Sequence, residues 1–169
     1  MNELTRAYRI SLRGAPAQKA LQRFRAQLKD WGLAMPPAPP LVLDFGLGDF
    51  AATGLIECWI ANESRAGYCG KYLFVFDGQA CPRHRHRVKH ETFCVVRGRV
   101  RMTSGKRTWV MKPGDVFAVP HWTYHGFCGQ GPALLLEVST PCKVADNFFM
   151  NPSIPIGGNQ RKPQRGAGP

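Results

Sequence analysis

Apolar residues recur at two different periods along this chain, and the change of period divides it into parts. Within residues 16–31 the apolar side chains stand three or four positions apart, the spacing of one face of an amphipathic helix: Leu21, Phe24, Leu28 and Trp31. Gly32 is a suitable stop for this helix. Residues 35–40 contain four prolines, which cannot continue a helix because proline lacks an amide donor. This segment predicts an extended connector.

After about residue 41 the pattern changes to short runs rich in β-branched and aromatic residues, separated by turn sequences such as Asp77-Gly78. Strands are expected at 56–60, 71–76, 92–96, 99–103, 108–111, 116–119 and 133–138. Many short strands at this spacing predict a mainly β sandwich or barrel. We therefore expect residues 1–40 to pack as helix and connector on a barrel of residues 41–150. Residues 151–169, rich in Gly and Pro, are expected to form a mobile basic tail.

Composition agrees with a single globular domain, since 44% of the 169 residues are apolar. No stretch reaches the roughly 18 apolar residues of a membrane helix, and the N-terminus lacks the pattern of a signal peptide. The six cysteines include no C-x-x-C pair, so we expect reduced, structural thiols. Together these features predict a soluble, cytoplasmic protein without a membrane partner.

Three histidines and a glutamate form a candidate metal site. His84 and His86 stand one residue apart, so on a strand both imidazoles point to the same face. A turn brings back Glu91, and His125 follows a later strand. Three imidazoles and a carboxylate suit Mn, Fe, Co, Ni or Zn, and ligand identity alone does not select among them. A lone buried histidine is more often a hydrogen-bonded core residue than a metal ligand, and we assign that ordinary role to the other two histidines: His90 and His121.

The same residues resemble the two conserved motifs of the cupin superfamily. The first motif matches from Gly78 to Gly98 as glycine, five residues, H-x-H, four residues, glutamate, six residues, glycine. The second matches at Gly114, Pro120 and His125, whereas Trp122 stands where glycine is usual. The resemblance implies a double-stranded β-helix, or jelly-roll, barrel that holds a divalent metal on four residues: His84, His86, Glu91 and His125.

Further segments are similar to the D-lyxose isomerase family of cupins over about residues 15–149: 43–50 (LDFGLGDF), 54–56 (GLI), 68–71 (YCGK), 137–140 (EVST) and 146–147 (DN). This resemblance implies a homodimeric, commonly Mn2+-dependent aldose–ketose isomerase. Its substrates would be D-lyxose and D-xylulose and, as in many members, D-mannose and D-fructose. Carried over by position, the catalytic residues are Lys89 and Glu137, and the substrate-binding residues are Lys71 and Asp146.

Physical chemistry agrees with these roles. Isomerisation moves a proton between neighbouring carbons through an enediolate, which a metal on the sugar oxygens stabilises. Glu137 shares a strand face with Ala133 and Leu135, so we expect it inside the barrel and, because burial disfavours its charge, more basic than in water. The alternatives are an exposed strand-end position for Glu137 and solvated surface positions for Lys71 and Lys89.

The net charge of +12 raises the question of an anionic partner. Nine of the 23 Lys and Arg residues lie within 83–107. If His84 and His86 face the metal, the arginines that alternate with them face outward. In the same way, Arg99 and Arg101 alternate with Val100 and Met102 and are expected on the outer face. The charge then belongs to the outer surface. No helix-turn-helix or aromatic-rich RNA-binding motif is present, so nucleic acid is not expected as a partner.

Other function classes share the metal site. A three-His, one-Glu centre also suits oxygen chemistry, so a metal-dependent cupin dioxygenase is one alternative. A non-catalytic sugar-binding cupin, or a module associated with nucleic acid through its positive charge, is another.

Overall fold

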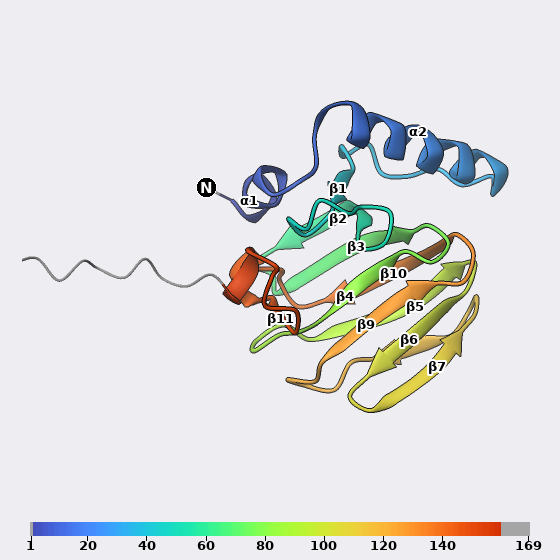
Figure 1. The fold of residues 1–169 in the computed structure, drawn as a ribbon. Helices are drawn as coiled ribbons and strands as arrows, with labels where there is room; N and C mark the ends of the chain where they lie inside the picture. The colour runs from blue at the N-terminus through green and yellow to red at the C-terminus, as the bar shows by residue number, and fades with distance from the viewer. Residues whose placement is uncertain (1, 160–169) are drawn as a thin grey trace, which may run out of the picture.

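Two antiparallel sheets face each other and enclose the core of the protein (Figure 1). The computed structural model describes residues 2–159. The first sheet has the order β1 (Leu41–Leu43), β2 (Leu55–Glu63), β3 (Tyr68–Val75), β10 (Ala133–Ser139), β5 (Glu91–Arg97) and β8 (Val116–Ala118). The second has the order β11 (Phe148–Phe149), β4 (Ala80–Arg85), β9 (His125–Gly129), β6 (Val100–Ser104) and β7 (Arg107–Met111). The predicted mainly β architecture is confirmed.

Alternation along the strands places the core between the sheets. In β6, Val100 and Met102 are fully buried while Arg101 is exposed, as the sequence pattern predicted. The rings of Phe93 in β5 and Phe127 in β9 meet edge to face across the core at 5.8 Å. Each large apolar side chain buried in this way contributes about 1.5–3 kcal/mol, so the apolar face of each strand determines which side turns inward.

Three strands were not predicted, β1, β9 and β11, and β4 was expected only as the strand that carries His84 and His86. Strand β4 contains Pro82 among alternating basic residues, and β9 contains Gly126, which are poor strand signals. The glycine is required by packing, because a Cβ at Gly126 would lie 2.8 Å from the carbonyl oxygen of Cys81 in β4. A bulge between Cys81 and His84 then brings His84 opposite His125.

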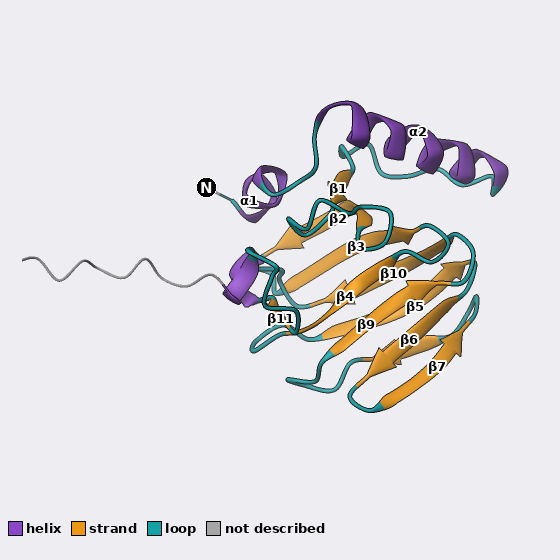
Figure 2. Cartoon of the chain, viewed as in Figure 1, coloured by secondary structure: helices purple, strands orange, loops and turns teal. Residues whose placement is uncertain are grey.

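Helix α2 (Gly14–Asp30) covers the outer face of the first sheet (Figure 2). Its residue Phe24 is 1% exposed and lies edge to face on Phe74 of β3, with ring centroids 5.0 Å apart. Gly32 follows the helix with φ 64° and donates its amide to the Lys29 carbonyl, which ends the helix as expected. The helix predicted over 16–31 is confirmed with a start two residues earlier. No helix within residues 2–159 is long and apolar enough to cross a membrane.

A short helix that was not predicted, α1 (Glu3–Arg9), lies near one end of the sheets together with two 3-10 turns, η1 (Val144–Asp146) and η2 (Gly157–Asn159) (Figure 2). The carboxylate of Glu3 accepts a hydrogen bond from the Val144 amide at 2.8 Å and so ties α1 to η1.

The expected tail begins later than residue 151. Ile154 is 1% exposed and Ile156 is 8% exposed, and both belong to the core cluster inside the barrel. These two side chains therefore attach the segment to the core, while residues 151–153 and Pro155 are exposed. The rest of the predicted tail, residues 160–169, lies outside the described residues.

Candidate metal centre and active site

The imidazoles of His84, His86 and His125 are buried side by side in the barrel. His84 lies in β4, His86 directly follows that strand, and His125 begins β9. Each Nδ1 lies within hydrogen-bond distance of a backbone carbonyl: His84 of Pro82 at 2.8 Å, His86 of Asp146 at 3.0 Å, and His125 of Thr123 at 2.9 Å. A carbonyl only accepts, so each Nδ1 must carry the hydrogen. The three Nε2 atoms therefore keep free lone pairs, as metal-ligating histidines do.

Glu91 completes the cluster from the start of β5. Its Oε2 lies 3.1 Å from Nε2 of His86 and 2.8 Å from Nε2 of His125. These three atoms are buried and yet make no well-directed hydrogen bond. One ligand atom from each of the four residues lies within 4.8 Å of all the others. Buried polar atoms that converge without hydrogen bonds lose about 1–3 kcal/mol each unless something else satisfies them, and a divalent cation fits this donor set.

The ionisation of the cluster also suits a cation. Burial, with help from His125 and His86, holds the pKa of His84 well below its usual range, so this imidazole is neutral and its lone pair is available. Burial opposes the charge on Glu91, but the ammonium group of Lys89 outweighs burial and holds the pKa of Glu91 well below its usual range. Glu91 is therefore a carboxylate.

Lys89 joins the cluster to a second carboxylate. Its Nζ lies 2.5 Å from Oε1 of Glu91 and 2.6 Å from Oε1 of Glu137. Ser139 donates a further hydrogen bond to Glu137 at 2.8 Å. Strand register explains the arrangement, because β10 places Ser139 opposite Glu91 and Glu137 opposite Lys71 of β3. The Lys71 Nζ lies 3.8 Å from Oε2 of Glu137.

Both lysines and Glu137 are buried, so the alternative positions on the surface are wrong. Lys71, Lys89 and Glu137 are 3%, 6% and 2% exposed. The expectation that burial makes Glu137 more basic is also wrong. Burial does push its pKa upward, but Lys71 and Lys89 outweigh burial and leave the pKa below its usual value. The reason is that opposite charges within hydrogen-bond distance stabilise the carboxylate more than desolvation penalises it.

Asp146 does not belong to this set of paired lysine and glutamate side chains. Its carboxylate accepts hydrogen bonds from three successive backbone amides, those of Arg87, Val88 and Lys89, at 3.1, 3.1 and 2.9 Å. Its own carbonyl accepts the Nδ1 hydrogen of His86. Asp146 therefore anchors the loop that carries Lys89 and orients one imidazole of the cluster.

Trp122, which stands where the cupin motif usually has glycine, lies in the loop before His125. Trp122 has φ 55°, the left-handed conformation that glycine adopts without strain. Its ring packs on Phe148 at 5.3 Å and on the guanidinium of Arg85 at 3.8 Å, so aromatic and cation–π contacts hold a strained backbone. The core positions expected for His90 and His121 are wrong, because both residues are exposed and their rings stack on each other outside the cluster.

Sequence reasoning missed Glu57. Its side chain is 13% exposed and its Oε2 lies 3.6 Å from Nζ of Lys71. The signal was present, because Glu57 alternates with Leu55 and Trp59 on the inward face of β2. With Glu57, the linked charged side chains beside the cluster comprise three carboxylates and two ammonium groups, an excess of one negative charge that favours a divalent cation.

The two facing sheets and the enclosed His/Glu cluster define a cupin. A model of the cupin domain matches residues 74–139, which include all four residues of the cluster. The structure of Cellulomonas parahominis L-ribose isomerase with L-ribose superposes with a TM-score of 0.69 at 16% identity, over 86% of this chain and 96% of that one. This likeness supports the fold.

Two curated relatives identify the family. The D-lyxose/D-mannose isomerase of Thermosediminibacter oceani is 32% identical, with 67% of this chain and 77% of the relative aligned. The D-lyxose ketol-isomerase of Cohnella laeviribosi is 29% identical, with 85% of this chain and 94% of the relative aligned. The chain belongs to the D-lyxose isomerase family of cupins, whose members are sugar isomerases, that is, intramolecular oxidoreductases.

Proposed function

We propose that this protein is a metal-dependent aldose–ketose isomerase that interconverts D-lyxose with D-xylulose and, as a second pair, D-mannose with D-fructose. One observation carries the proposal: Lys89 contacts both Glu91 of the His/Glu cluster and Glu137, a carboxylate outside the cluster. A cation site, a base and an ammonium group thus lie within hydrogen-bond reach of one another. The named substrates of the curated relatives support the choice of sugars.

The reaction moves one proton from the carbon that bears a hydroxyl to the neighbouring carbonyl carbon, and one proton between their oxygens, with no net oxidation. His84, His86, Glu91 and His125 would hold a divalent cation, which would supply positive charge against the negative charge that develops during the proton transfer. Glu137, held ionised by Lys71 and Lys89, takes the proton from one carbon and returns it to the next.

The remaining residues have separate roles in the proposal. Burial opposes the charge on Lys89, but Glu137 and Glu91 outweigh burial and raise its pKa. Lys89 therefore stays an ammonium group and donates hydrogen bonds to the oxygen that gains charge. Lys71 binds a sugar hydroxyl. Asp146 acts through the loop it anchors rather than by touching the substrate.

The family and the chemistry of the site also support a choice of metal, cellular compartment and oligomeric state. We assign Mn2+ as the cation, with Fe, Co, Ni and Zn as the other ions that suit this donor set. We also propose a cytoplasmic homodimer. All six cysteines are free in the structure, which agrees with a reducing compartment. Several arginines outside the barrel stack on aromatic rings, as Arg85 does on Trp122 and Arg107 on Trp109, and we propose no nucleic-acid partner.

The test combines metal analysis with a sugar panel. Wild-type protein should bind about one Mn2+ per chain and convert D-lyxose to D-xylulose. His86→Ala should lose both properties, because one of the four ligands is missing, whereas the matched control His90→Ala, an exposed histidine outside the cluster, should keep both. Absence of ketose from every aldopentose and aldohexose would overturn the proposal. Oxygen uptake by the metal-loaded protein would favour a dioxygenase instead.

A further inference from the structure

Two small cavities, of about 50 and 40 Å3, lie inside the barrel next to the His/Glu cluster. They share five lining residues: Phe45, Glu57, Lys71, Asn147 and Phe149. The smaller cavity is also lined by His84, Glu91 and Glu137, whereas the other extends toward α1. A substrate whose reacting carbons lie at the cluster can extend from the smaller cavity into the other one, and Glu57 borders that path. The pocket on the other side of the cluster, next to Pro120 and Trp122, is smaller, at about 10 Å3.

Charged side chains of alternating sign follow the same path. From the cluster outward, Glu91 contacts Lys89 and Lys89 contacts Glu137. Lys71 then bridges Glu137 at 3.8 Å and Glu57 at 3.6 Å. Glu57 thus forms the far end of a row whose near end belongs to the candidate metal centre. The first four members of the row already have proposed roles, and Glu57 has none.

Trp59 holds the carboxylate of Glu57 in place. The indole Nε1 donates a hydrogen bond to Oε2 of Glu57 at 2.8 Å, and Nζ of Lys71 lies 4.9 Å from the centre of a Trp59 ring. Within residues 2–159 both protein contacts of the Glu57 carboxylate thus go to one oxygen, Oε2. The other oxygen, Oε1, remains available as an acceptor for a hydroxyl group.

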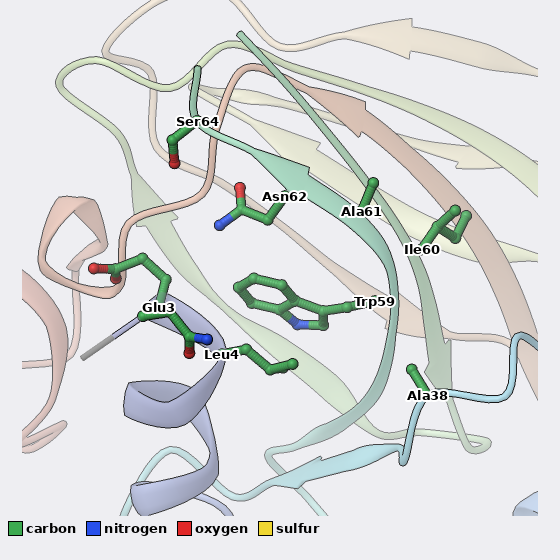
Figure 3. A pocket seen from close by; sticks show the side chains of 9 residues that line it. Glu3, Leu4, Ala38, Trp59, Ile60, Ala61, Asn62 and Ser64 are labelled. Carbon is green, nitrogen blue, oxygen red and sulfur yellow. The ribbon is translucent and has the colours of Figure 1, made fainter. Parts of the chain in front are cut away.

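Trp59 also separates the interior from the surface. It is 6% exposed, and it lines both the larger inner cavity and an outer groove of about 520 Å3 between α1 and β2. Figure 3 shows its ring extending from β2 toward Leu4 and Glu3 of α1. The same indole therefore closes the interior path at the point where Glu57 stands.

We propose that Glu57 binds the hydroxyl groups at the end of the sugar remote from the reacting carbons, and that Trp59 positions this carboxylate. The inference rests on the proposed isomerase function and adds the residue that distinguishes sugars by their distal hydroxyls. A carboxylate accepts hydrogen bonds from two hydroxyls at once. The apolar rings of Phe45 and Phe149 line the same space and suit the C–H faces of a sugar.

The experiment compares Glu57→Gln and Trp59→Phe with wild type, all loaded with Mn2+. Glu63→Gln is the matched control, because Glu63 ends the same strand but is exposed. Glu57→Gln should raise KM for the preferred aldopentose about tenfold, the effect of weakening a hydrogen bond to a charged group. The same variant should lower kcat less than about threefold and leave metal content unchanged. The ratio of kcat/KM between sugars that differ only at distal hydroxyls should move closer to one. Trp59→Phe should move KM in the same direction by a smaller factor, and Glu63→Gln should change nothing.

A pentitol that corresponds to the preferred pentose provides a readout independent of turnover, because it keeps the distal hydroxyls but lacks the carbonyl. Its affinity, measured by calorimetry on metal-loaded protein, should fall about tenfold in Glu57→Gln. Equal KM, sugar preference and pentitol affinity in Glu57→Gln and wild type would overturn the inference while wild-type turnover upholds the isomerase. If wild type converts no sugar, the proposed function fails, and pentitol binding alone decides the role of Glu57. If Glu57→Gln does not fold, an unchanged KM in Trp59→Phe overturns the inference.

Discussion

Several buried side chains in the barrel interior are charged, because side chains of opposite charge beside them stabilise the ionised form. Glu91 and Glu137 are almost fully buried, which by itself would favour their neutral forms. Lys89 lies between them and keeps both ionised. Removal of any member leaves an uncompensated buried charge, so substitutions here must preserve shape if chemistry is to be separated from folding.

Glu137→Gln is the substitution that preserves shape and removes the proposed base. We expect kcat with D-lyxose to fall by about 100- to 10,000-fold, the usual contribution of a general base, with Mn2+ content unchanged because Glu137 is not among the four clustered residues. Steady-state kinetics and elemental analysis measure the two effects. Glu63→Gln serves as the exposed control. A variant that keeps more than a tenth of wild-type kcat would show that another group moves the proton.

Asp146→Asn tests the loop anchor. An asparagine oxygen cannot replace both carboxylate oxygens that accept the amides of residues 87–89. We expect the free energy of unfolding to fall by about 1–3 kcal/mol. Metal affinity should fall by about 10- to 100-fold, because loss of the loop anchor shifts the backbone carbonyl of residue 146 that orients His86. Urea denaturation and metal titration measure these changes, with Asp30→Asn, on the exposed end of α2, as the control. Unchanged metal affinity would contradict the orienting role.

At the scale of elements, tight turns set the strand register that brings the site together. Gly98 lies between β5 and β6 with φ 73°, and a Cβ there would lie 2.1 Å from the carbonyl oxygen of Pro132. Gly105 lies in the next turn, between β6 and β7, with φ 57°, but a Cβ there would meet only a methyl of Thr123 at 3.7 Å. The two glycines share the left-handed conformation and differ in the space around them.

This difference gives a matched pair of variants. Gly105→Ala should cost about 1 kcal/mol for the strained backbone conformation alone, whereas Gly98→Ala should cost at least about 2 kcal/mol more because backbone atoms must move apart. Chemical denaturation of both variants measures the two costs. Equal destabilisation would mean that the turn after β5 adjusts easily and does not hold the register of β5 against β10.

At the scale of the whole molecule, the two sheets together supply the cluster. His84, His86 and His125 come from the second sheet or its edge, and Glu91 comes from the first. A cation that binds all four therefore links the two layers and binds only the folded chain. Metal binding and folding are expected to be coupled.

Mn2+ should accordingly stabilise the protein. At a free concentration of 100 times Kd the gain is about 2.7 kcal/mol, which for a chain of this size raises Tm by about 5–10 °C. Differential scanning calorimetry with and without a chelator measures the shift. Mg2+ at the same concentration should give a smaller one, because it prefers oxygen ligands to imidazole, and His86→Ala should give almost none. A rise in Tm in His86→Ala as large as in wild type would place the cation elsewhere.

Much of this architecture could be predicted from local patterns. Alternation of side chains along a strand is a local property, so it located most strands, placed Arg101 outside and Met102 inside, and put Glu137 in the barrel. Local signals failed where packing against another strand makes the element. Strand β9, for example, depends on the close approach of Gly126 to β4.

By itself, the sequence determined the four-residue cluster and the face of the barrel on which it lies. His84, His86 and Glu91 are close together in the sequence, and the alternation of side chains along a strand determines which way they point. Only the tertiary structure decided how the charges pair. Register between β2, β3, β10 and β5 places Glu57, Lys71, Glu137 and Lys89 in one row. That pairing, rather than burial, sets the pKa of Glu137, because electrostatic interactions depend on distances between residues far apart in the chain.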